Sequence, residues 1–225
     1  MAMFLIELTD HFGQLKPVEA DRAPDTCPIC HRGIEAKLVS VGHWVQEKLR
    51  FQAVFQCVNH KCRNIFIGTY TSPSTGRWQL VAVEPTRASP IPVPPEIAKV
   101  SPQYVTIRQQ VAAAEANGLD QLVGIGLRKA LEFLIKDFAI SEHPEKEHEI
   151  KKEWLGSCIE EYILDVKVKQ CAKRATWLGN DQAHYIKKWE SKDVSDLKTL
   201  VTLTVNWIHN HLMTEQFVGD MPEKG

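Results

Sequence analysis

Four of the six cysteines stand in two closely spaced pairs, and this spacing is typical of a metal site. Cys27 and Cys30 form a CxxC pair, and Cys57 and Cys62 form a wider C-x4-C pair. A tight loop lets two thiolates reach one ion, and a second loop completes a tetrahedral shell. Because four cysteines leave no open position for water, the pattern predicts a structural zinc site rather than a catalytic one.

Other interpretations of these cysteines stay open. His60 is an alternative ligand in place of a cysteine of the second pair, and His31 lies beside the first pair. Buried structural thiols or a CxxC redox pair are further alternatives, although a redox pair usually opens a helix in a βαβ unit, which this segment lacks. Cys158 and Cys171 stand alone on apolar helix faces and are expected to be buried packing residues.

The segment that holds the two pairs has a β pattern, with turn-forming residues before its last strand. This arrangement matches a zinc ribbon, in which each cysteine pair lies at the end of a β-hairpin. Metal binding, on the order of 10 kcal/mol, would then be folding energy for a module with little core of its own. Strands are expected over 36–45, 51–56, 64–70 and 78–83, and a proline-rich linker follows over 84–95.

Basic residues surround the cysteine pairs and are interleaved with Trp44 and Phe51. Basic and aromatic surfaces of this kind are compatible with nucleic-acid binding. A solvated charged face is the alternative, and the pattern taken alone favours it. The candidate nucleic-acid-binding residues are Arg32, Lys37, Lys48, Arg50, Lys61 and Arg63.

After residue 100 the pattern becomes helical. Ser101 and Pro102 are of the types that cap and begin a helix, and Gly118 can end it. The segment Gly179-Asn180-Asp181 is expected to interrupt the helical pattern. An apolar stripe on the last helix favours a homodimer. Helices are expected over about 101–118, 120–140, 149–163, 165–177 and 195–213.

Polar residues from two of these helices can form one cluster. Arg128 and Glu132 are four residues apart, as are Asn180 and His184, so each pair shares a face if its segment is helical. If the helices pack, the four residues form a buried cluster, which needs hydrogen bonds whether or not it does chemistry. Helix caps and a surface ion pair are the local alternative.

The segments GLRKALEFL (126–134) and WLGNDQAH (177–184) carry a family resemblance. Together with a last long helix, they resemble the family called domain of unknown function 4145, which is placed in the HEPN-like superfamily. The resemblance covers about residues 100–215, and members of the family often carry an N-terminal zinc ribbon. It implies an antiparallel helical bundle that associates with nucleotides or nucleic acids.

The resemblance also implies a candidate activity. Many HEPN proteins are metal-independent ribonucleases that use an arginine a few residues before a histidine, usually doubled across a homodimer. His184 matches that histidine, whose role is proton transfer around the RNA 2′-hydroxyl. The arginine would fall at 177–179, where this chain has no basic residue, and Arg174 lies farther away. A non-catalytic member of the superfamily is therefore favoured.

Composition limits the class of protein. The chain has 225 residues, a net charge of -1, 44% hydrophobic and 24% charged residues, which is ordinary for a globular protein and excludes a globally cationic coat. No apolar stretch approaches the roughly 18 residues of a membrane span. The N-terminus lacks the basic flank and cleavage site of a signal peptide. We expect a cytoplasmic protein that makes no membrane contact.

These patterns together predict an α+β chain in four parts. A zinc-ribbon domain with an N-terminal extension (1–85) is followed by a proline-rich linker (86–100), an all-α HEPN-like antiparallel helical bundle (101–215) and a flexible tail (216–225). The leading hypothesis is a non-catalytic, zinc-containing module that binds RNA, DNA or a protein partner as a homodimer, in prokaryotic or phage conflict systems. The alternatives are an endoribonuclease toxin that uses His184 and a purely structural assembly factor.

Overall fold

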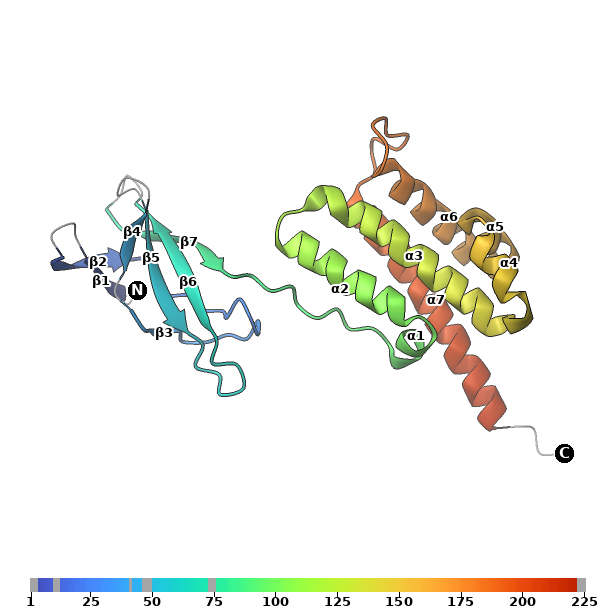
Figure 1. Cartoon of the computed structure of the whole chain (residues 1–225), viewed down its shortest axis with the longest axis horizontal. Helices are drawn as coiled ribbons and strands as arrows, with labels where there is room; N and C mark the ends of the chain where they lie inside the picture. Colours follow the sequence, from blue (N-terminus) through green and yellow to red (C-terminus); the bar gives the residue numbers. More distant parts are fainter. Residues whose placement is uncertain (1–3, 10–12, 41, 46–49, 73–75, 222–225) are drawn as a thin grey trace. The chain divides into compact units, whose positions relative to one another are not determined.

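The computed structural model describes residues 4–9, 13–40, 42–45, 50–72 and 76–221. It divides into two compact units, Met1–Ser89 and Pro90–Gly225. Among the described residues the first unit holds the strands and the second holds the helices (Figure 1). The chain is therefore mixed α+β, with a sheet region followed by a helical region, as the sequence patterns predict.

A hairpin and a larger sheet make up the N-terminal unit. The hairpin pairs β1 (Phe4–Thr9) with β2 (Leu15–Ala20), a segment in which no strand was expected. The larger sheet has the order β3-β5-β6-β7, with β4 also paired to β5, and its pairings are antiparallel. Its strands are β3 (Lys37–Leu38), β4 (His43–Val45), β5 (Arg50–Gln56), β6 (Ile65–Thr71) and β7 (Gln79–Glu84).

The expected strand 36–45 is divided into β3 and β4 near Gly42. The Gly42 backbone N–H donates to the carbonyl of Glu7, and its carbonyl accepts from the N–H of Thr9. A Cβ at Gly42 would overlap the side chain of Leu8. Because the chain turns here to meet the hairpin, it leaves the ladder with β5, and one long strand becomes two short ones.

Backbone hydrogen bonds join the hairpin to the larger sheet at two places, and aromatic side chains form the core of the unit. Gly42, just before β4, bonds to β1, and Trp78, just before β7, bonds to the end of β2. Inside, Phe51 stacks on Tyr70 with ring centroids 4.8 Å apart, and Trp44 packs edge-on against Phe51. Phe51 and Tyr70 are fully buried. The unit therefore has a core of its own, which corrects the expectation of a module with little core.

Seven α-helices and one short 3-10 helix are described in the C-terminal unit. The first helix falls inside the expected linker 86–100. The last helix continues to Asp220, so 216–220 are helical, while residues 222–225 of the expected tail lie outside the described residues. The helices are α1 (Pro95–Val100), α2 (Pro102–Ala116), α3 (Asp120–Glu142), η1 (Pro144–Lys146), α4 (Glu147–Lys152), α5 (Leu155–Tyr162), α6 (Val166–Asp181) and α7 (Val194–Asp220).

Local signals account for some helix ends and miss others. Gly118 follows α2 with a positive φ of 68°, as a glycine stop should. Ser101 occupies the N-cap position of α2, but its hydroxyl donates to a carboxylate oxygen of Asp137 (2.5 Å) instead of capping. The expected helix 149–163 is two helices, α4 and α5, because the backbone is extended at Glu153 and Trp154.

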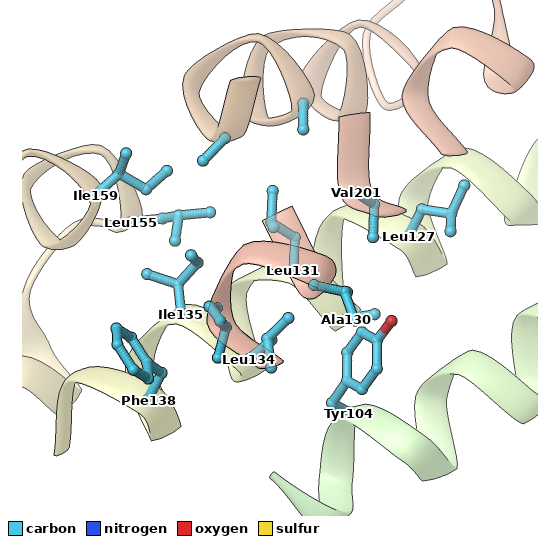
Figure 2. Close-up of a cluster of buried hydrophobic side chains, with 14 of the residues drawn as sticks. Tyr104, Leu127, Ala130, Leu131, Leu134, Ile135, Phe138, Leu155, Ile159 and Val201 are labelled. Carbon is cyan, nitrogen blue, oxygen red and sulfur yellow. The ribbon is translucent and has the colours of Figure 1, made fainter. Parts of the chain in front are cut away.

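Helix α3 is the centre of the helical unit. Its side chains Leu127, Leu131 and Leu134 are fully buried, and Figure 2 shows residues of α2, α5 and α7 converging on them. The neighbours that converge include Tyr104, Ile159 and Val201. Side chains of the α7 stripe that suggested a homodimer, Leu197, Val205 and Ile208, are buried in this same core. These three residues are thus covered within one chain, while Leu203 of the same stripe remains 46% exposed, and the homodimer stays a prediction.

No helix among the described residues is both long enough and apolar enough to cross a membrane.

Candidate functional site

The four cysteines of the two pairs come together in the N-terminal unit. Their Sγ atoms all lie within 4.8 Å of one another, with Cys27 to Cys62 at 3.9 Å and Cys30 to Cys57 at 3.8 Å. A tetrahedral ion with metal–sulfur bonds of about 2.3 Å places its sulfurs about 3.8 Å apart. A disulfide would need about 2.05 Å. The four side chains are therefore free thiols, arranged so that they could hold one metal ion.

The first cysteine loop is a tight turn closed by backbone hydrogen bonds. The N–H of His31 donates to the carbonyl of Cys27 (2.9 Å), and the N–H of Ile29 donates to the Cys27 Sγ (3.4 Å). His31 has a positive φ of 56°, which is uncommon for a residue with a side chain. This left-handed residue turns the chain back after Cys30, so both sulfurs face the same point.

The second loop repeats this turn with an asparagine in place of the first cysteine. The N–H of Arg63 donates to the carbonyl of Asn59 (3.0 Å), and the N–H of Lys61 donates to Asn59 Oδ1 (3.2 Å). Arg63 has a φ of 49°, matching the left-handed residue of the first loop. Cys57, directly after β5, supplies its sulfur from just outside this turn, which explains the wider C-x4-C spacing.

Asn59 and Asn64 are members of the site that the sequence analysis missed. Asn59 Nδ2 lies 3.7 Å from Cys30 Sγ, and Asn64 Nδ2 lies 3.2 Å from Cys62 Sγ. Amide donors of this kind stabilise negative charge on sulfur. The available signal was position: Asn59 precedes Cys62 by the interval at which Cys27 precedes Cys30.

The four thiols differ in how readily they ionise. The side-chain amide of Asn64 lowers the pKa of Cys62 to about 6, and the backbone of Arg32 lowers the pKa of Cys30. Burial raises the pKa of Cys57 to about 12 and also raises that of Cys27. Cys62 and Cys30 are thus the thiols that ionise most readily, and the charge of a bound cation would favour ionisation of the two buried thiols as well. Metal binding should therefore release protons.

The remaining cysteines and histidines stand outside this group. His31 and His60 are exposed, and neither belongs to the metal-ligating cluster found among the described residues. Cys158 is fully buried, as expected for a packing residue, whereas Cys171 is only partly buried. The four cysteines could therefore fill a tetrahedral shell without a histidine.

Four of the candidate basic residues surround the cysteine loops, and we call Arg32, Lys37, Lys61 and Arg63 the metal-end cations. All four are exposed. Arg32 ends the first loop, Lys61 and Arg63 lie in the second, and Lys37 pairs with the residue that precedes Cys57. None forms an ion pair with a carboxylate of the described residues.

The other two candidate basic residues do not join this group. Arg50 begins β5 and therefore lies at the opposite end of that strand from Cys57. Lys48 falls outside the described residues.

The candidate polar cluster of the helical unit forms with three of its four residues. Arg128 Nε donates to Asn180 Oδ1 (3.1 Å), and Arg128 Nη1 lies 3.1 Å from Glu132 Oε2. Lys136 joins on the other side of Glu132, also at 3.1 Å. His184 is exposed and lies beyond α6, which ends at Asp181, so the expected helical spacing from Asn180 does not apply. No interaction among the described residues links it to the cluster.

Gly179 and Asp181 of the WLGNDQAH segment have packing roles. Gly179 does not interrupt α6; a Cβ there would lie 2.6 Å from the Arg128 Cβ, so glycine is what lets α3 and α6 approach closely. Asp181 is buried, and its Oδ2 accepts hydrogen bonds from the backbone N–H groups of Lys188 and Trp189, both at 2.9 Å. The motif therefore joins two helices and anchors the segment that follows.

Comparison of the chain with protein-family models, with curated proteins and with solved structures gives no significant match.

Proposed function

We propose that this protein is a zinc-containing, HEPN-like module that binds nucleic acid without cleaving it. The observation that carries the proposal is the set of metal-end cations, which are exposed, have no carboxylate partner among the described residues and surround the two cysteine loops. Exposed cations without carboxylate partners are available to phosphate groups. The net charge of the whole chain is only -1, so the attraction would be local rather than global.

Zinc is the metal proposed for the four cysteines. Tetrahedral sites of four sulfur ligands suit zinc, and four protein ligands leave no position for a reacting water. In this proposal the residues of the two loops bind the ion, and the ion in turn supplies the binding energy that holds the loops in place. The two loops carry Arg32, Lys61 and Arg63, so the metal would fix the spacing of these cations.

The charges of the helical unit are arranged differently, which supports assigning phosphate contacts to the metal end. Most of its lysines near α4 to α7 lie against carboxylates, as in the pairs Lys146 with Glu161 (3.0 Å) and Lys192 with Asp196 (2.9 Å). An exposed ion pair has already neutralised part of the field that a phosphate would feel.

The HEPN-like assignment of the helical unit rests on the two segments that carry the family resemblance. The first lies on α3, the second begins on α6 and continues past its end at Asp181, and the two meet where Gly179 packs on Arg128. The polar cluster at this contact is a structural one in our proposal, and His184 is not a catalytic base. The homodimer, the cytoplasmic location and the role in conflict systems are also proposals, and the last of them follows from the resemblance alone.

A salt titration tests the proposal. Binding of the full chain to a labelled single-stranded RNA, duplex RNA and DNA is measured between low and high salt. The triple variant Arg32→Gln, Lys37→Gln, Lys61→Gln should bind more weakly, and its log–log salt slope should fall by about 0.7 for each contact removed on a single strand. The control variant Lys99→Gln, Lys151→Gln, Lys152→Gln removes the same charge from the helical unit and should leave the slope unchanged.

Each contrary outcome points to a different function. Equal loss of slope in the two triple variants would show a diffuse charge effect and contradict a specific surface. Binding to none of the nucleic acids would favour a protein partner and the assembly hypothesis. RNA products on gels of the same samples, lost in His184→Ala, would establish the ribonuclease alternative instead.

A further inference from the structure

The helical unit contains a cavity built around two tryptophans to which the sequence analysis gave no joint role. The cavity has a volume of about 280 Å³ and is mostly apolar. It is lined by the C-terminal half of α6, the segment after it and the first turns of α7. The residues used below are Arg174, Trp177, Trp189 and Lys192.

The two indole rings are parallel. Trp177 and Trp189 have centroids 6.2 Å apart and planes only 2° from parallel, and both remain 44% exposed. Paired aromatic rings usually pack inside a core, but these line an open cavity. Because the two ring planes are parallel, a flat aromatic ligand that lies parallel to one ring also lies parallel to the other.

The chain around these rings is held in place before any ligand arrives. Trp177 and Asp181 are four residues apart on α6 and share a face. The buried carboxylate of Asp181 accepts the backbone N–H of Trp189 and that of its neighbour Lys188, both at 2.9 Å. The buried acceptor thus anchors the backbone that carries the second ring, and a preorganised site loses less entropy on binding.

A cation borders the aromatic surface. The Arg174 guanidinium carbon lies 5.9 Å from the Trp177 ring centroid, within cation–π range. Its Nη1 donates to the carbonyl of Gln170 (3.1 Å), and no carboxylate among the described residues pairs with it. Lys192, in contrast, is paired with Asp196 at 2.9 Å. Arg174 is therefore the cation of this cavity with donors to spare for an anion.

We propose that this cavity binds one nucleobase, stacked on Trp177 and Trp189, with the phosphate of the same nucleotide on Arg174. Aromatic stacking with an adjacent arginine is how proteins bind unpaired bases without reading sequence. The volume lies just below the range of about 300–1,000 Å³ that is typical of ligand pockets, which suits one base rather than a larger cofactor. The nucleotide can be free or part of a single strand.

The inference adds a base-binding site in the helical unit to the nucleic-acid binding proposed for the metal end. This new site can be tested independently of the metal-end proposal. Tryptophan fluorescence of the full chain is titrated with adenosine 5′-monophosphate, with a short single-stranded oligoadenylate, with adenosine and with pyrophosphate. Trp189→Leu keeps an apolar side chain in the cavity, and Trp154→Leu removes a tryptophan that is 83% exposed as the matched control. Circular dichroism verifies that each variant is folded.

Trp189→Leu should weaken binding of the nucleotide or the oligoadenylate about tenfold, the size expected for one lost stacking partner, while Trp154→Leu binds as the wild type does. Arg174→Gln should weaken binding of the phosphate-bearing probes and leave adenosine unchanged. An effect on the oligoadenylate alone identifies a single strand as the ligand, and an effect on the mononucleotide alone identifies a free nucleotide; both support the site.

Unchanged binding of both probes in folded Trp189→Leu and Arg174→Gln proteins would overturn the site, as would pyrophosphate binding as tightly as the nucleotide. The metal-end triple variant separates this result from the proposed function. If that variant loses salt-dependent strand binding while the tryptophan variants do not, the metal-end proposal stands and the cavity proposal fails. If mononucleotide binding survives in the metal-end variant but not in Trp189→Leu, the cavity proposal stands independently.

Discussion

The two units of this chain differ in the interactions that stabilise them. The N-terminal unit has a small aromatic core centred on Phe51 and Tyr70, and its cysteine loops carry two residues in left-handed conformations. The helical unit has a larger aliphatic core around α3 and closes its helices on one another through glycines such as Gly179. The four cysteines of the first unit could hold one metal ion between its loops, whereas packing, hydrogen bonds and ion pairs hold the helices of the second unit together.

Their charges differ in the same way. The metal-end cations are exposed and form no ion pair within the part of the chain that the structure describes, while many lysines of the helical unit lie against glutamates and aspartates. A loop held by a metal ion can present cations without needing ion pairs for its stability, because the ion supplies the binding energy. In the helical unit, surface ion pairs contribute little each, and they leave less charge available to a ligand.

Metal removal is the strongest test of this contrast. Cys27→Ser, or a chelator, should abolish the thermal transition of the N-terminal unit, because structural zinc contributes on the order of 10 kcal/mol. The transition of the helical unit should not move. Differential scanning calorimetry with elemental analysis measures both, and Cys171→Ser, a thiol outside the site, should keep about one zinc per chain. A metal-free chain with an unchanged first transition would contradict the zinc site.

A packing substitution in the helical unit is expected to have a smaller effect. Gly179→Ala places a Cβ 2.6 Å from the Arg128 Cβ, so the free energy of unfolding should fall by about 1–3 kcal/mol despite the better helix propensity of alanine. Gly156→Ala, where nothing lies within 4 Å of the new Cβ, is the matched control and should be neutral or slightly stabilising. Urea denaturation measures both. Equal effects at the two sites would show that α3 and α6 are not in close contact.

The smallest expected effect concerns pH. Burial raises the pKa of Glu132, but the hydrogen bond from Lys136 and the charge of Arg128 lower it more, so its net pKa is below the ordinary value. A depressed pKa in the folded state contributes stability above the unfolded-state pKa, and this contribution is lost as pH falls through the folded-state pKa.

Glu132→Gln should therefore destabilise the helical unit at neutral pH by less than about 1 kcal/mol, since the pair is partly exposed, and the difference from the wild type should shrink in acid. Denaturation midpoints at neutral and acidic pH measure this difference. A difference that grows on acidification would have the wrong sign and would show that these ion pairs do not stabilise the helical unit.

The sequence by itself determined the features that depend on interactions between residues close together in the chain. Cysteine spacing brought out the four ligand candidates because two residues on one tight turn must lie close together. The change from alternating to helical periodicity near residue 100 indicated a sheet region followed by a helical region, since each periodicity reflects which face of an element is buried, although the first helix already begins at Pro95. The stop at Gly118 followed from backbone sterics alone.

Only the tertiary structure decided the features that depend on contacts distant in the chain. The signal at Gly179 is the same as that of a helix stop, and only its contact with Arg128 shows that it permits close packing within a continuous helix. His184 left the polar cluster because α6 ends at Asp181. Trp177 and Trp189 became one surface because a buried carboxylate folds the intervening segment back, and no local pattern records where a chain returns.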